Sequence, residues 1–550
     1  MSPLSTKAEP TMRLLRILAG IPFIAAPLLA QVRPAAPPPK FDAYVAAVLK
    51  RFEVPGMGIA IVKDGQVVLA RGYGVKRLGA PEPVDADTRF GIASNTKAFT
   101  ALALGMLVEE GKLEWDAPVV DYLPQFMMWD PWVTRQITVR DLLVHRSGLG
   151  LGAGDLLWWP PTTYTAQEIV RRLRYIEPAT SFRTAYAYDN VLYLVAGQLI
   201  QAVSGLTWED FVTERILRPV GMAGATVTRK EAEEAGANVA ITHAPVEGVV
   251  RVVNPFSDPN TNAAGGLNVG AADMARWMIA QMDSGRVGEK RLWKAGTTRQ
   301  LWSLVTPIPG GPPPKELPPL VSNFGGYALG FFVRDYRGQK LVTHTGGLPG
   351  YVSRLAMLPN QKTGVVVLTN MESGAAFDAV AYHVLDYYLK APAFDWLAGW
   401  GSLMARVDST NAAEDKATSA ARDSTSRPSL PLARYAATYR DSWYGDVAVT
   451  LEDSRLAMKF LHTPALIGDL LHWQYDTFLV RWRDRELRAD AFELRAVRGG
   501  KGRERIDEAC LADGGLQFRL SGSRPQARAG ALIDADPPVR RELEDAPRPR

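Results

Sequence analysis

The apolar residues of this chain form strand-like runs in two regions that lie far apart in sequence. Near the N-terminus, residues 41–52 have the spacing of an amphipathic helix, and two apolar runs then flank Asp64-Gly65. An Asp-Gly pair between apolar runs is a strong signal for a β-hairpin. The first region therefore predicts a helix followed by two paired strands.

The second region lies at 327–370 and has the same strand pattern. Turns are expected at Arg337-Gly338 and at 359–362, and a helix-like run follows at 375–390. The long stretch between the two regions is mostly helical or looped in pattern. Together these features predict an α+β domain at 40–400, with one antiparallel sheet assembled from both ends of the domain, flanking helices and a large helical insert.

Beyond this domain the pattern changes. Residues 401–430 contain a polar stretch with too few apolar side chains to pack, which predicts a linker. Short alternating strands at 431–523 predict a small all-β, barrel-like domain. The last residues, 524–550, are rich in Arg, Pro and Asp and are predicted to be a disordered tail.

The N-terminus has the pattern of a targeting segment. Two arginines precede an apolar stretch at 17–30, and residues 31–39 are a Pro/Ala-rich linker. The apolar stretch is shorter than the ~20 residues that span a bilayer, so residues 1–30 are predicted to be a secretory signal peptide. A retained membrane anchor is the alternative. We expect a periplasmic or secreted protein with no stable membrane span after signal cleavage.

Composition and charge exclude several classes of function. The net charge of +5 is small for 550 residues, and the Lys and Arg residues are spread along the chain, so no nucleic-acid partner is expected. The single cysteine, Cys510, excludes an intrachain disulfide and a cysteine-based metal cluster. The histidines never fall at a metal-ligand spacing such as HExxH, so no metal site is expected.

Ser94 and Lys97 lie at the start of an apolar, helix-like run. Residues three apart are neighbours on a helix, so Lys97 can hydrogen-bond Ser94. A serine hydroxyl needs an adjacent base to act as a nucleophile, and free N–H groups at a helix start favour a developing negative charge. The base must be neutral, although the ordinary pKa of lysine is about 10.4, so we expect Lys97 to be buried. The pair alone is weak evidence, because an exposed lysine at a helix start gives the same pattern.

Two further segments carry candidate chemistry. Tyr188 and Asn190 precede an amphipathic helix whose start can be capped by Asp189 or Asn190. The sequence His-Thr-Gly-Gly at 344–347 follows a strand, and its glycines allow a close approach of the backbone to a ligand.

With these motifs the sequence resembles the serine hydrolases of the penicillin-binding-protein and class C beta-lactamase superfamily, over about 40–390. The three motifs of that family match, in order, Ser94-x-x-Lys97, Tyr188-x-Asn190 and His344-Thr345-Gly346. The segments 142–149 and 263–278 also look like features of the family. The C-terminal strands resemble the lipocalin-like accessory domain often appended to these hydrolases.

The resemblance implies a beta-lactamase/transpeptidase-like fold and a serine hydrolase that needs no cofactor. It implies that Ser94 forms an acyl-enzyme while Lys97 and Tyr188 move the proton. The implied substrate-binding residues are Asn190, His344, Thr345, Gly346 and Gly347. Asn190 would bind a substrate amide, and the backbone N–H groups of Ser94 and Gly347 would form the oxyanion hole.

His344 departs from the family pattern, in which a lysine usually supplies a permanent cation for a substrate carboxylate. A histidine is mostly neutral near pH 7, which puts efficient beta-lactam hydrolysis in doubt. We therefore expect an esterase or peptidase acting on a small-molecule or peptide substrate. The alternatives are a beta-lactamase or D-Ala-D-Ala carboxypeptidase and, from another class, a non-catalytic penicillin-binding-like receptor or scaffold. A role for His344 in bonding a nearby loop and a homo-oligomer formed through the C-terminal domain also stay open.

His145 and two aromatic clusters are interpreted first as structural features. His145 is expected to end a helix, with Gly148 as the residue that caps its C-terminus. The aromatic clusters at 127–132 and 158–161 lie in loop-like stretches, where core packing is the default. The alternative is an apolar wall that favours hydrophobic acyl or peptide side chains.

Overall fold

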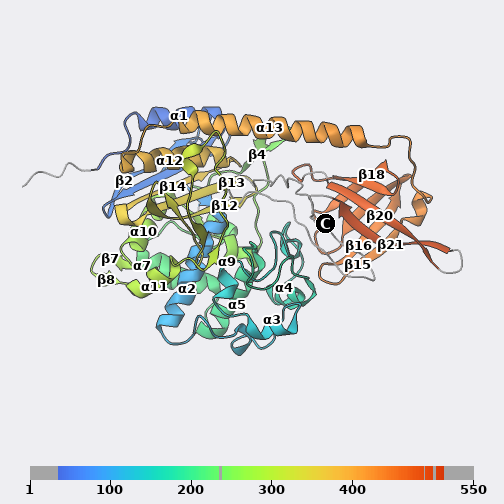
Figure 1. Ribbon diagram of the computed structural model, residues 1–550, viewed down its shortest axis with the longest axis horizontal. Helices are drawn as coiled ribbons and strands as arrows, with labels where there is room; N and C mark the ends of the chain where they lie inside the picture. The colour runs from blue at the N-terminus through green and yellow to red at the C-terminus, as the bar shows by residue number, and fades with distance from the viewer. Residues whose placement is uncertain (1–34, 235–237, 488–489, 500–502, 513–550) are drawn as a thin grey trace, which may run out of the picture. The chain divides into compact units, whose positions relative to one another are not determined.

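The computed structural model describes residues 35–234, 238–487, 490–499 and 503–512, and it contains two antiparallel sheets joined by a long helix (Figure 1). The predictions of a signal peptide at 1–30 and of a disordered tail at 524–550 concern residues outside these ranges. Among the described helices, no single one is both long and apolar enough to cross a membrane. One bent pair, Val191–Ser204 with Trp208–Val220, meets the criteria of length and composition only when both helices are counted together.

The large sheet has eight strands and is assembled from both ends of the domain. Its order is β2 (Gln66–Gly74), β1 (Gly56–Lys63), β14 (Thr363–Thr369), β13 (Tyr351–Leu358), β12 (Gln339–Leu348), β11 (Phe332–Tyr336), β10 (Gly325–Tyr327) and β9 (Thr306–Pro307). Every pair in it is antiparallel, and Met57 of β1 lies opposite Thr369 of β14. The predicted α+β fold with one large antiparallel sheet is confirmed.

The turns of this sheet form where the sequence predicts them. Asp64 and Gly65 have φ values of 52° and 76°, and Arg337 and Gly338 have 47° and 72°. Two successive residues with positive φ are the mark of the tight hairpin turns that Asp-Gly sequences favour. The third predicted turn contains a short 3₁₀ helix, Pro359–Gln361.

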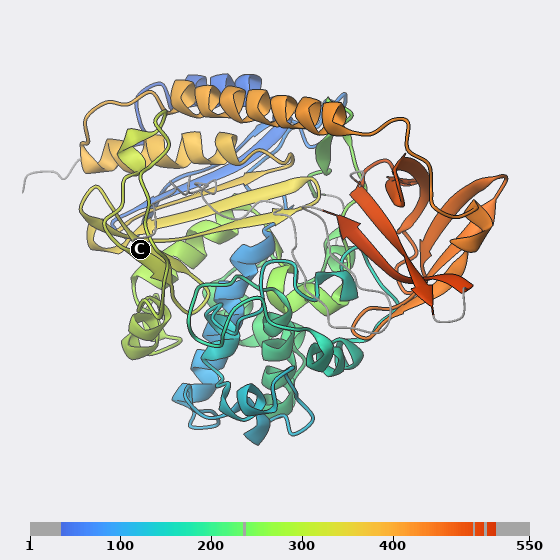
Figure 2. The ribbon, with the colours of Figure 1, turned by 45° about the vertical axis from the view of Figure 1, so that its right-hand side comes forward.

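Helices cover both faces of the sheet (Figures 1 and 2). On one face, α1 (Phe41–Arg51), α12 (Gly374–Leu389) and α13 (Trp396–Ala421) share an apolar cluster with Ile59 and Ile61 of β1. On the other face, α2 (Lys97–Glu109) and α10 (Ala271–Met282) share a cluster with Ala60 and Val62. Alternate side chains of β1 thus serve two cores, which explains why the whole strand is apolar.

The helical insert lies between β2 and β9. Its α-helices are α2 and α10, already named, and α3 (Pro131–Gln136), α4 (Ala166–Arg172), α5 (Val191–Ser204), α6 (Trp208–Val212), α7 (Arg218–Val220), α8 (Arg229–Glu234), α9 (Asn262–Gly265) and α11 (Ala295–Leu301). Short strands pair as β3 (Phe90–Gly91) with β6 (Asn268–Val269), β4 (His243–Val246) with β5 (Val249–Val252), and β7 (Arg286–Val287) with β8 (Lys290–Arg291). Among its 3₁₀ helices are η1 (Ala93–Thr96), η3 (Asp141–Leu143) and η4 (Asp155–Leu157).

The second sheet is an antiparallel meander in which each strand pairs with the next. Its strands are β15 (Ala437–Asp441), β16 (Gly445–Glu452), β17 (Arg455–Phe460), β18 (Ile467–Gln474), β19 (Thr477–Trp482), β20 (Asp490–Gly499) and β21 (Arg503–Ala512). An all-β C-terminal domain is therefore confirmed. The described strands form an open order from β15 to β21, so a closed, lipocalin-like barrel stays a prediction.

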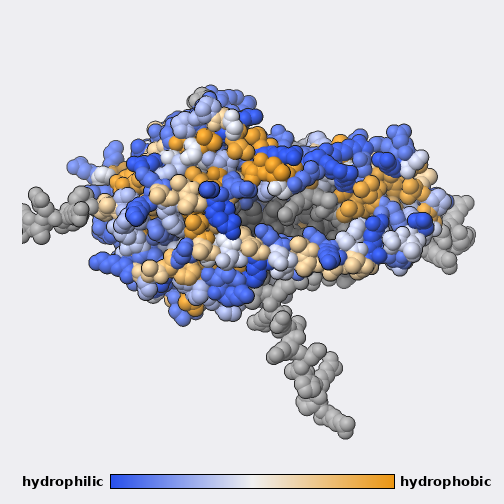
Figure 3. All heavy atoms as spheres, turned by 90° about the horizontal axis from the view of Figure 1, so that it is seen from above, coloured by the Kyte–Doolittle hydropathy of each residue, from blue (hydrophilic) through white to orange (hydrophobic). Residues whose placement is uncertain are grey.

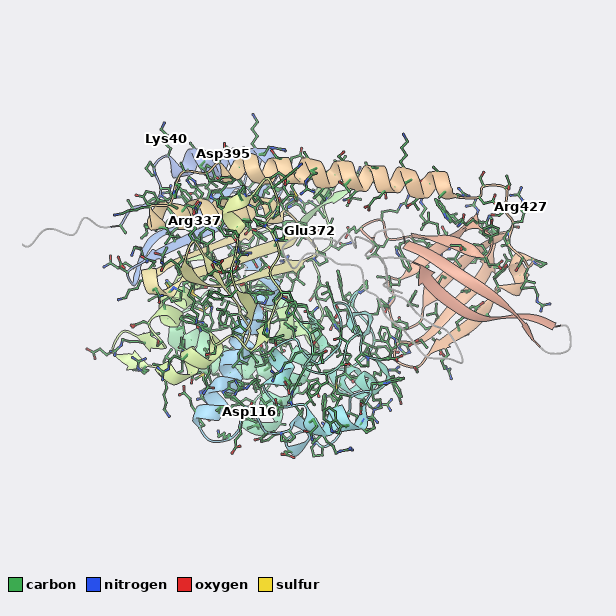
Figure 4. All side chains as sticks on the ribbon, in the orientation of Figure 1. Lys40, Asp116, Arg337, Glu372, Asp395 and Arg427 are labelled. Atoms are coloured by element: carbon green, nitrogen blue, oxygen red, sulfur yellow. The ribbon has the colours of Figure 1, made fainter. Side chains whose placement is uncertain are left out.

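Much of the polar linker predicted at 401–430 is helical, because α13 continues through Ala421. Asp395 caps the start of this helix by accepting a hydrogen bond from Ala398 N at 2.9 Å (Figure 4). Residues 408–421 are all exposed, and much of the surface on this side is hydrophilic (Figure 3). A run rich in Ala, Glu, Asp and Lys has enough intrinsic helix propensity to extend a helix that is already anchored by packing.

Residues just after η4 contact the C-terminal sheet. Thr163 N donates to His462 O at 2.9 Å, and the Tyr164 ring stacks on the His462 ring with centroids 4.2 Å apart. The Tyr164 hydroxyl donates to the backbone oxygen of Tyr444, and Arg172 of α4 donates to Trp443 O at 3.0 Å. The C-terminal domain is thus attached to the helical insert as well as to α13.

Candidate active site

Ser94 lies where a short strand turns into a buried helix. After β3 the chain passes through Ala93, whose φ of 49° is uncommon for a residue with a side chain, and enters η1 and then α2. Such a backbone conformation costs about 1–3 kcal/mol and persists only where surrounding contacts hold it. The sharp bend brings the Ser94 hydroxyl onto the same side as Lys97, one turn further along.

Contacts with the large sheet hold this bend in place. Ser353 Oγ of β13 donates to Ile92 O at 2.8 Å and accepts from Asn95 Nδ2 at 2.8 Å. A Cβ added to Gly346 of β12 would lie 2.1 Å from Ile92 O and 3.0 Å from the Ala93 Cβ. Only glycine permits this approach, which puts the third motif against the segment that carries Ser94.

The turn that follows the third motif is also anchored. Gly350 N, between β12 and β13, donates to Glu372 Oε1 at 2.8 Å. Glu372 lies just beyond β14, and Figure 4 labels it near the end of the sheet. The end of β12 that carries residues 344–347 is therefore tied to the neighbouring strands by a side chain as well as by strand pairing.

The structure brings Ser94, Lys97 and Tyr188 together. Lys97 Nζ lies 2.8 Å from Ser94 Oγ, and the Tyr188 hydroxyl lies 2.9 Å from the same oxygen. Ser94 is 9% exposed, Tyr188 6% and Lys97 0%. The expected burial of Lys97 is confirmed, and the hydroxyl has two candidate proton acceptors at hydrogen-bond distance.

Lys97 Nζ has two further oxygen contacts. It donates to Asn190 Oδ1 at 2.8 Å and to Ala264 O, on α9, at 3.2 Å. Nζ also lies 5.1 Å from the centre of the Tyr188 ring and 5.2 Å from that of Tyr193. These contacts fix the direction of the amine with respect to Ser94.

Of the two candidate caps for α5, Asp189 is the one that acts. Its Oδ1 accepts from Leu192 N at 3.2 Å, and its Oδ2 accepts from Ser147 Oγ at 3.1 Å. Asn190 occupies the N-cap position, but its side chain makes no capping hydrogen bond. Burial raises the pKa of Asp189 to about 7, against the opposing effect of these hydrogen bonds. Asn190 is left to contact Lys97.

The helix predicted to end at His145 is only the three-residue η3, and His145 itself has a φ of 53°. Its ring is fully buried, with its centroid 4.1 Å from that of Tyr188 and 4.3 Å from that of Tyr327. Burial is the main cause that holds the pKa of His145 well below its usual range. His145 is therefore a neutral ring that supports Tyr188 from behind.

His344 is also fully buried, and its Nε2 pairs with the Tyr327 hydroxyl at 2.8 Å. Its Nδ1 lies 2.5 Å from the backbone oxygen of Thr345. Burial is the main cause that lowers the pKa of His344 well below its usual value. These contacts favour the alternative in which His344 bonds neighbouring structure, since a buried, neutral ring cannot present a cation to a substrate carboxylate.

Sequence reasoning missed Asp155 altogether. Asp155 begins η4, is 8% exposed, and accepts a hydrogen bond from Asn190 Nδ2 at 3.2 Å. Burial raises the pKa of Asp155 to about 7. No motif marks this aspartate, and 35 positions separate it from Asn190, so only the folded chain reveals that they meet.

A cavity of about 180 Å³ lies beside the segment that precedes Ser94. Gly91 of β3 lines it, together with Gly265 of α9, where an added Cβ would lie 3.6 Å from Ala93. The apolar side chains of its wall come from Phe256, Leu348 and Tyr351, and the cationic ones from Arg229 and Lys230.

The two aromatic clusters differ in their relation to this cavity. Trp158 is buried, and its ring packs edge-on against Phe256 with centroids 6.2 Å apart, so the cluster at 158–161 supports the cavity wall from behind. Trp132 is 55% exposed and packs against Phe182. Of the described residues that line the cavity, none comes from 127–132.

The arrangement suits acyl transfer. A hydroxyl in contact with an amine and a phenol, in a largely dry site, has the components of an activated nucleophile. Among the described residues, no group of three or more His, Cys, Asp or Glu side chains is placed to hold a metal ion.

Comparison with known proteins yields two family matches in this chain. The beta-lactamase family model matches residues 41–389, and a model described as a domain of unknown function, DUF3471, matches residues 421–500. The first match contains all three motifs, and the second overlaps the all-β domain.

Individual proteins of similar sequence or fold agree with the match to the beta-lactamase family. The unguisins hydrolase of Aspergillus violaceofuscus (strain CBS 115571) is 30% identical over 443 residues, which cover 75% of this chain and 76% of that protein. Protein flp of Staphylococcus aureus (strain MW2) is 27% identical over 339 residues, covering 61% of this chain and 63% of that protein. The octameric penicillin-binding protein homologue from Pyrococcus abyssi has a similar fold, with a TM-score of 0.56 at 22% identity, over 83% of this chain and 96% of that one.

Proposed function

Because this chain belongs to the beta-lactamase family, we propose that it is a serine hydrolase that forms an acyl-enzyme on Ser94. The observation that carries the proposal is the position of the Ser94 hydroxyl, within 3 Å of both Lys97 Nζ and the Tyr188 hydroxyl. A relative named as a hydrolase supports the same class of reaction.

The first step is attack of Ser94 Oγ on the carbonyl carbon of an ester or amide. The Oγ–C bond forms, the carbonyl π electrons move to oxygen, and the hydroxyl proton passes to Lys97 or Tyr188. When the intermediate collapses, the bond to the leaving group breaks and the leaving group takes the proton. Water then attacks the ester on Ser94 in the same way, which releases the acid and restores the hydroxyl.

The surroundings of Lys97 support its role as the base. Ser94 Oγ, Asn190 Oδ1 and Ala264 O, which contact Nζ, are all uncharged, and burial disfavours the charged form of an amine. The Tyr188 hydroxyl can pass a proton between Ser94 and the leaving group. Because the two groups share one proton with Ser94, their titrations are coupled and belong to the pair.

The oxyanion hole is proposed at the backbone N–H groups of Ser94 and Gly347. The close packing of Gly346 against Ile92 and Ala93 supports this assignment, because it brings the backbone of the third motif to the start of η1. Losing one donor of an oxyanion hole typically costs ~2.7–4 kcal/mol of transition-state stabilisation.

We propose an ester, amide or peptide as the substrate in preference to a beta-lactam or a D-Ala-D-Ala peptide. The burial of His344 and its bond to Tyr327 support this choice, because they leave the third motif without the cation that usually recognises a substrate carboxylate. Phe256, Leu348 and Tyr351 line a nearby cavity that suits an apolar acyl group.

The test is to incubate the purified protein with a fluorescent fluorophosphonate and, separately, with a fluorescent penicillin, beside a Ser94→Ala variant. We expect labelling by the fluorophosphonate alone, lost in the variant. Labelling by both probes would point to penicillin recognition. The absence of any label would overturn the enzyme assignment in favour of a receptor or scaffold.

We also propose that the protein is exported, on the pattern of arginines and apolar residues within 1–30. Expression of the full chain in a bacterial host and mass spectrometry of the periplasmic fraction test this: a mature chain beginning near residue 31 is expected. Recovery of the uncleaved chain with the membranes would support the retained anchor instead.

Light scattering of the chain with and without residues 422–550 tests the open alternative of a homo-oligomer formed through the C-terminal domain.

A further inference from the structure

Asp155 is a buried carboxylate that the reaction described above does not use. Its Oδ2 accepts a hydrogen bond from Asn190 Nδ2, whereas its Oδ1 has no hydrogen-bond partner among the residues that the structure describes. Buried polar groups are normally paired, because removing a carboxylate from water without full compensation is costly. Local packing alone therefore does not explain an aspartate at this position.

Asn190 joins this carboxylate to the proposed base. The asparagine stands at the start of α5, where Asp189 provides the cap in its place. Its amide instead spans two buried side chains, with Oδ1 accepting from Lys97 Nζ and Nδ2 donating to Asp155. The amide is held at both ends, between the start of α2 and η4.

The direction of the Asn190 amide matters for the chemistry of Lys97. An amide can turn over and exchange its oxygen and nitrogen, so its neighbours decide which end faces the amine. An ionised carboxylate only accepts hydrogen bonds, so Asp155 requires Nδ2 on its side and leaves Oδ1 facing Lys97. The backbone oxygen of Ala264 also only accepts. These two oxygens can accept both N–H bonds of a neutral amine, which directs its lone pair toward the hydroxyl of Ser94.

We propose that Asp155 is a positioning residue, which holds the Asn190 amide so that the lone pair of Lys97 faces Ser94. The inference rests on the proposed serine-hydrolase function. Without the carboxylate, Asn190 can turn its Nδ2 toward Lys97 and donate to the lone pair that must accept the hydroxyl proton. The nucleophile would then compete with an amide for its own base.

The contact between Asp155 and Asn190 also predicts that the rate of acylation depends on pH. Besides burial, the groups that act on Asp155 are the Asn190 hydrogen bond, Lys97 on α2 and Asp189 before α5. Burial is the largest effect and raises the pKa of Asp155 to about 7. A protonated Asp155 has an O–H that can donate to Asn190 Oδ1, which releases the amide. The active form is the ionised one, so the rate of acylation falls as pH falls.

The experiment compares the fluorophosphonate labelling rates of the wild type, Asp155→Leu and Asp155→Asn, each measured over about pH 5–9. In Asp155→Leu the second-order rate constant is expected to fall about tenfold to a hundredfold at the alkaline plateau, the size of effect that an unsatisfied buried amide produces. Asp155→Asn can pair with either end of the Asn190 amide, so a smaller loss is expected. In both variants the fall of the labelling rate at low pH should become smaller than in the wild type.

A double-mutant cycle separates positioning from a merely structural effect. If Asp155 acts through Asn190, the change Asp155→Leu should cost little once Asn190→Ala is present. Asp273→Asn is the matched control, because Asp273 is 5% exposed, its pKa is likewise raised by burial, and it lies on α10 in an ion pair with Arg276. This control is expected to lower thermal stability while leaving the labelling rate and its pH profile unchanged.

The outcomes distinguish the two proposals. If the wild type is labelled at Ser94 and Asp155→Leu is labelled at the wild-type rate at every pH, the positioning role is wrong and the hydrolase assignment stands. Additive losses in the cycle would also overturn it. A wild type that never labels overturns the hydrolase assignment itself. Should Asp155→Leu fail to fold, Asp155→Asn, which has nearly the same shape, provides the same comparison with and without Asn190→Ala.

Discussion

His145 and His344 are both buried behind the residues that surround Ser94, and both are neutral. Burial is the main cause that lowers their pKa values far below the ordinary value of about 6.5. In the unfolded chain each ring regains its ordinary pKa and takes up a proton in mild acid. The unfolded state then binds more protons than the folded state, so each histidine contributes stability that is present above about pH 6.5 and is lost as pH falls.

Replacing His344 with Gln removes one of these titrating rings. Relative to His344→Gln, the free energy of unfolding of the wild type should fall by roughly 1.4 kcal/mol for each pH unit below about 6.5. Urea unfolding of both proteins between about pH 5 and 8 measures the difference. Parallel pH dependences for the two proteins would show that His344 is not buried as a neutral ring.

Phe256 belongs to the wall of the cavity near Ser94 and is supported by Trp158. Phe256→Ala should enlarge the cavity and raise turnover of long-chain esters relative to acetate esters.

Trp158→Ala removes the support behind the wall and should weaken long-chain ester turnover more than acetate turnover. The kcat/KM ratios for a series of p-nitrophenyl esters test both changes. Equal changes at every chain length would mean that the acyl group binds elsewhere.

Trp132→Ala serves as the control for this series. Trp132 is largely exposed and packs against Phe182, away from the residues that line the cavity. Its replacement should leave the preference among chain lengths as it is in the wild type.

At the scale of elements, the site depends on how closely β12 approaches η1. Gly346→Ala would put a Cβ 2.1 Å from Ile92 O, so one of the two elements must move. We expect the variant to lose fluorophosphonate labelling by more than about tenfold and to be destabilised by about 1–3 kcal/mol, the usual range for overpacking. Gly311→Ala is the control, since an added Cβ there meets no atom of the described residues within 4 Å. Wild-type labelling of Gly346→Ala would mean that the third motif does not need this contact.

Elements with local signals could be predicted from the sequence. The hairpin at Asp64-Gly65 is specified by the two turn residues and the apolar runs on either side, and β1 is buried on both faces because it serves two cores. Pairing of the N-terminal strands with strands near 370 could also be anticipated, because both regions have the same pattern and neither has enough strands to form a sheet alone.

Other elements could not be predicted because their causes are not local. The polar half of α13 has the composition of a linker. It is helical because its residues have helix propensity and because it continues a helix that packing already holds. Ser94 and Lys97 could be predicted from their spacing at a helix start, and Tyr188 from the resemblance to a known family. Asp155 has no motif, and its role depends on a contact with Asn190 that only the folded insert creates.

At the scale of the whole molecule, Tyr164 connects the catalytic domain to the C-terminal sheet. Its ring contacts both Arg172, whose guanidinium carbon is 4.4 Å from the ring centre, and the stacked ring of His462. Tyr164→Ala should remove about 3–5 kcal/mol of packing, as for other buried aromatic side chains. Calorimetry is expected to show one unfolding transition in the wild type and two in the variant, as the C-terminal sheet loses its contact with the insert.

Thr410→Ala, at an exposed position of α13, is the control for Tyr164→Ala and should leave the single transition intact. A single transition in Tyr164→Ala, at the wild-type temperature, would mean that α13 alone couples the two sheets.

The pairing of β1 with β14 also governs when the proposed catalytic centre can form. A ribosome delivers Met57 long before Thr369, the residue that lies opposite it. Closing so long a loop is entropically costly and slow, and it must precede the meeting of β12 with the segment that carries Ser94. A nascent chain that ends short of β14 therefore has a serine and a lysine but no nucleophile. The site proposed around Ser94 is therefore expected to assemble only after strands from both ends of the domain have paired.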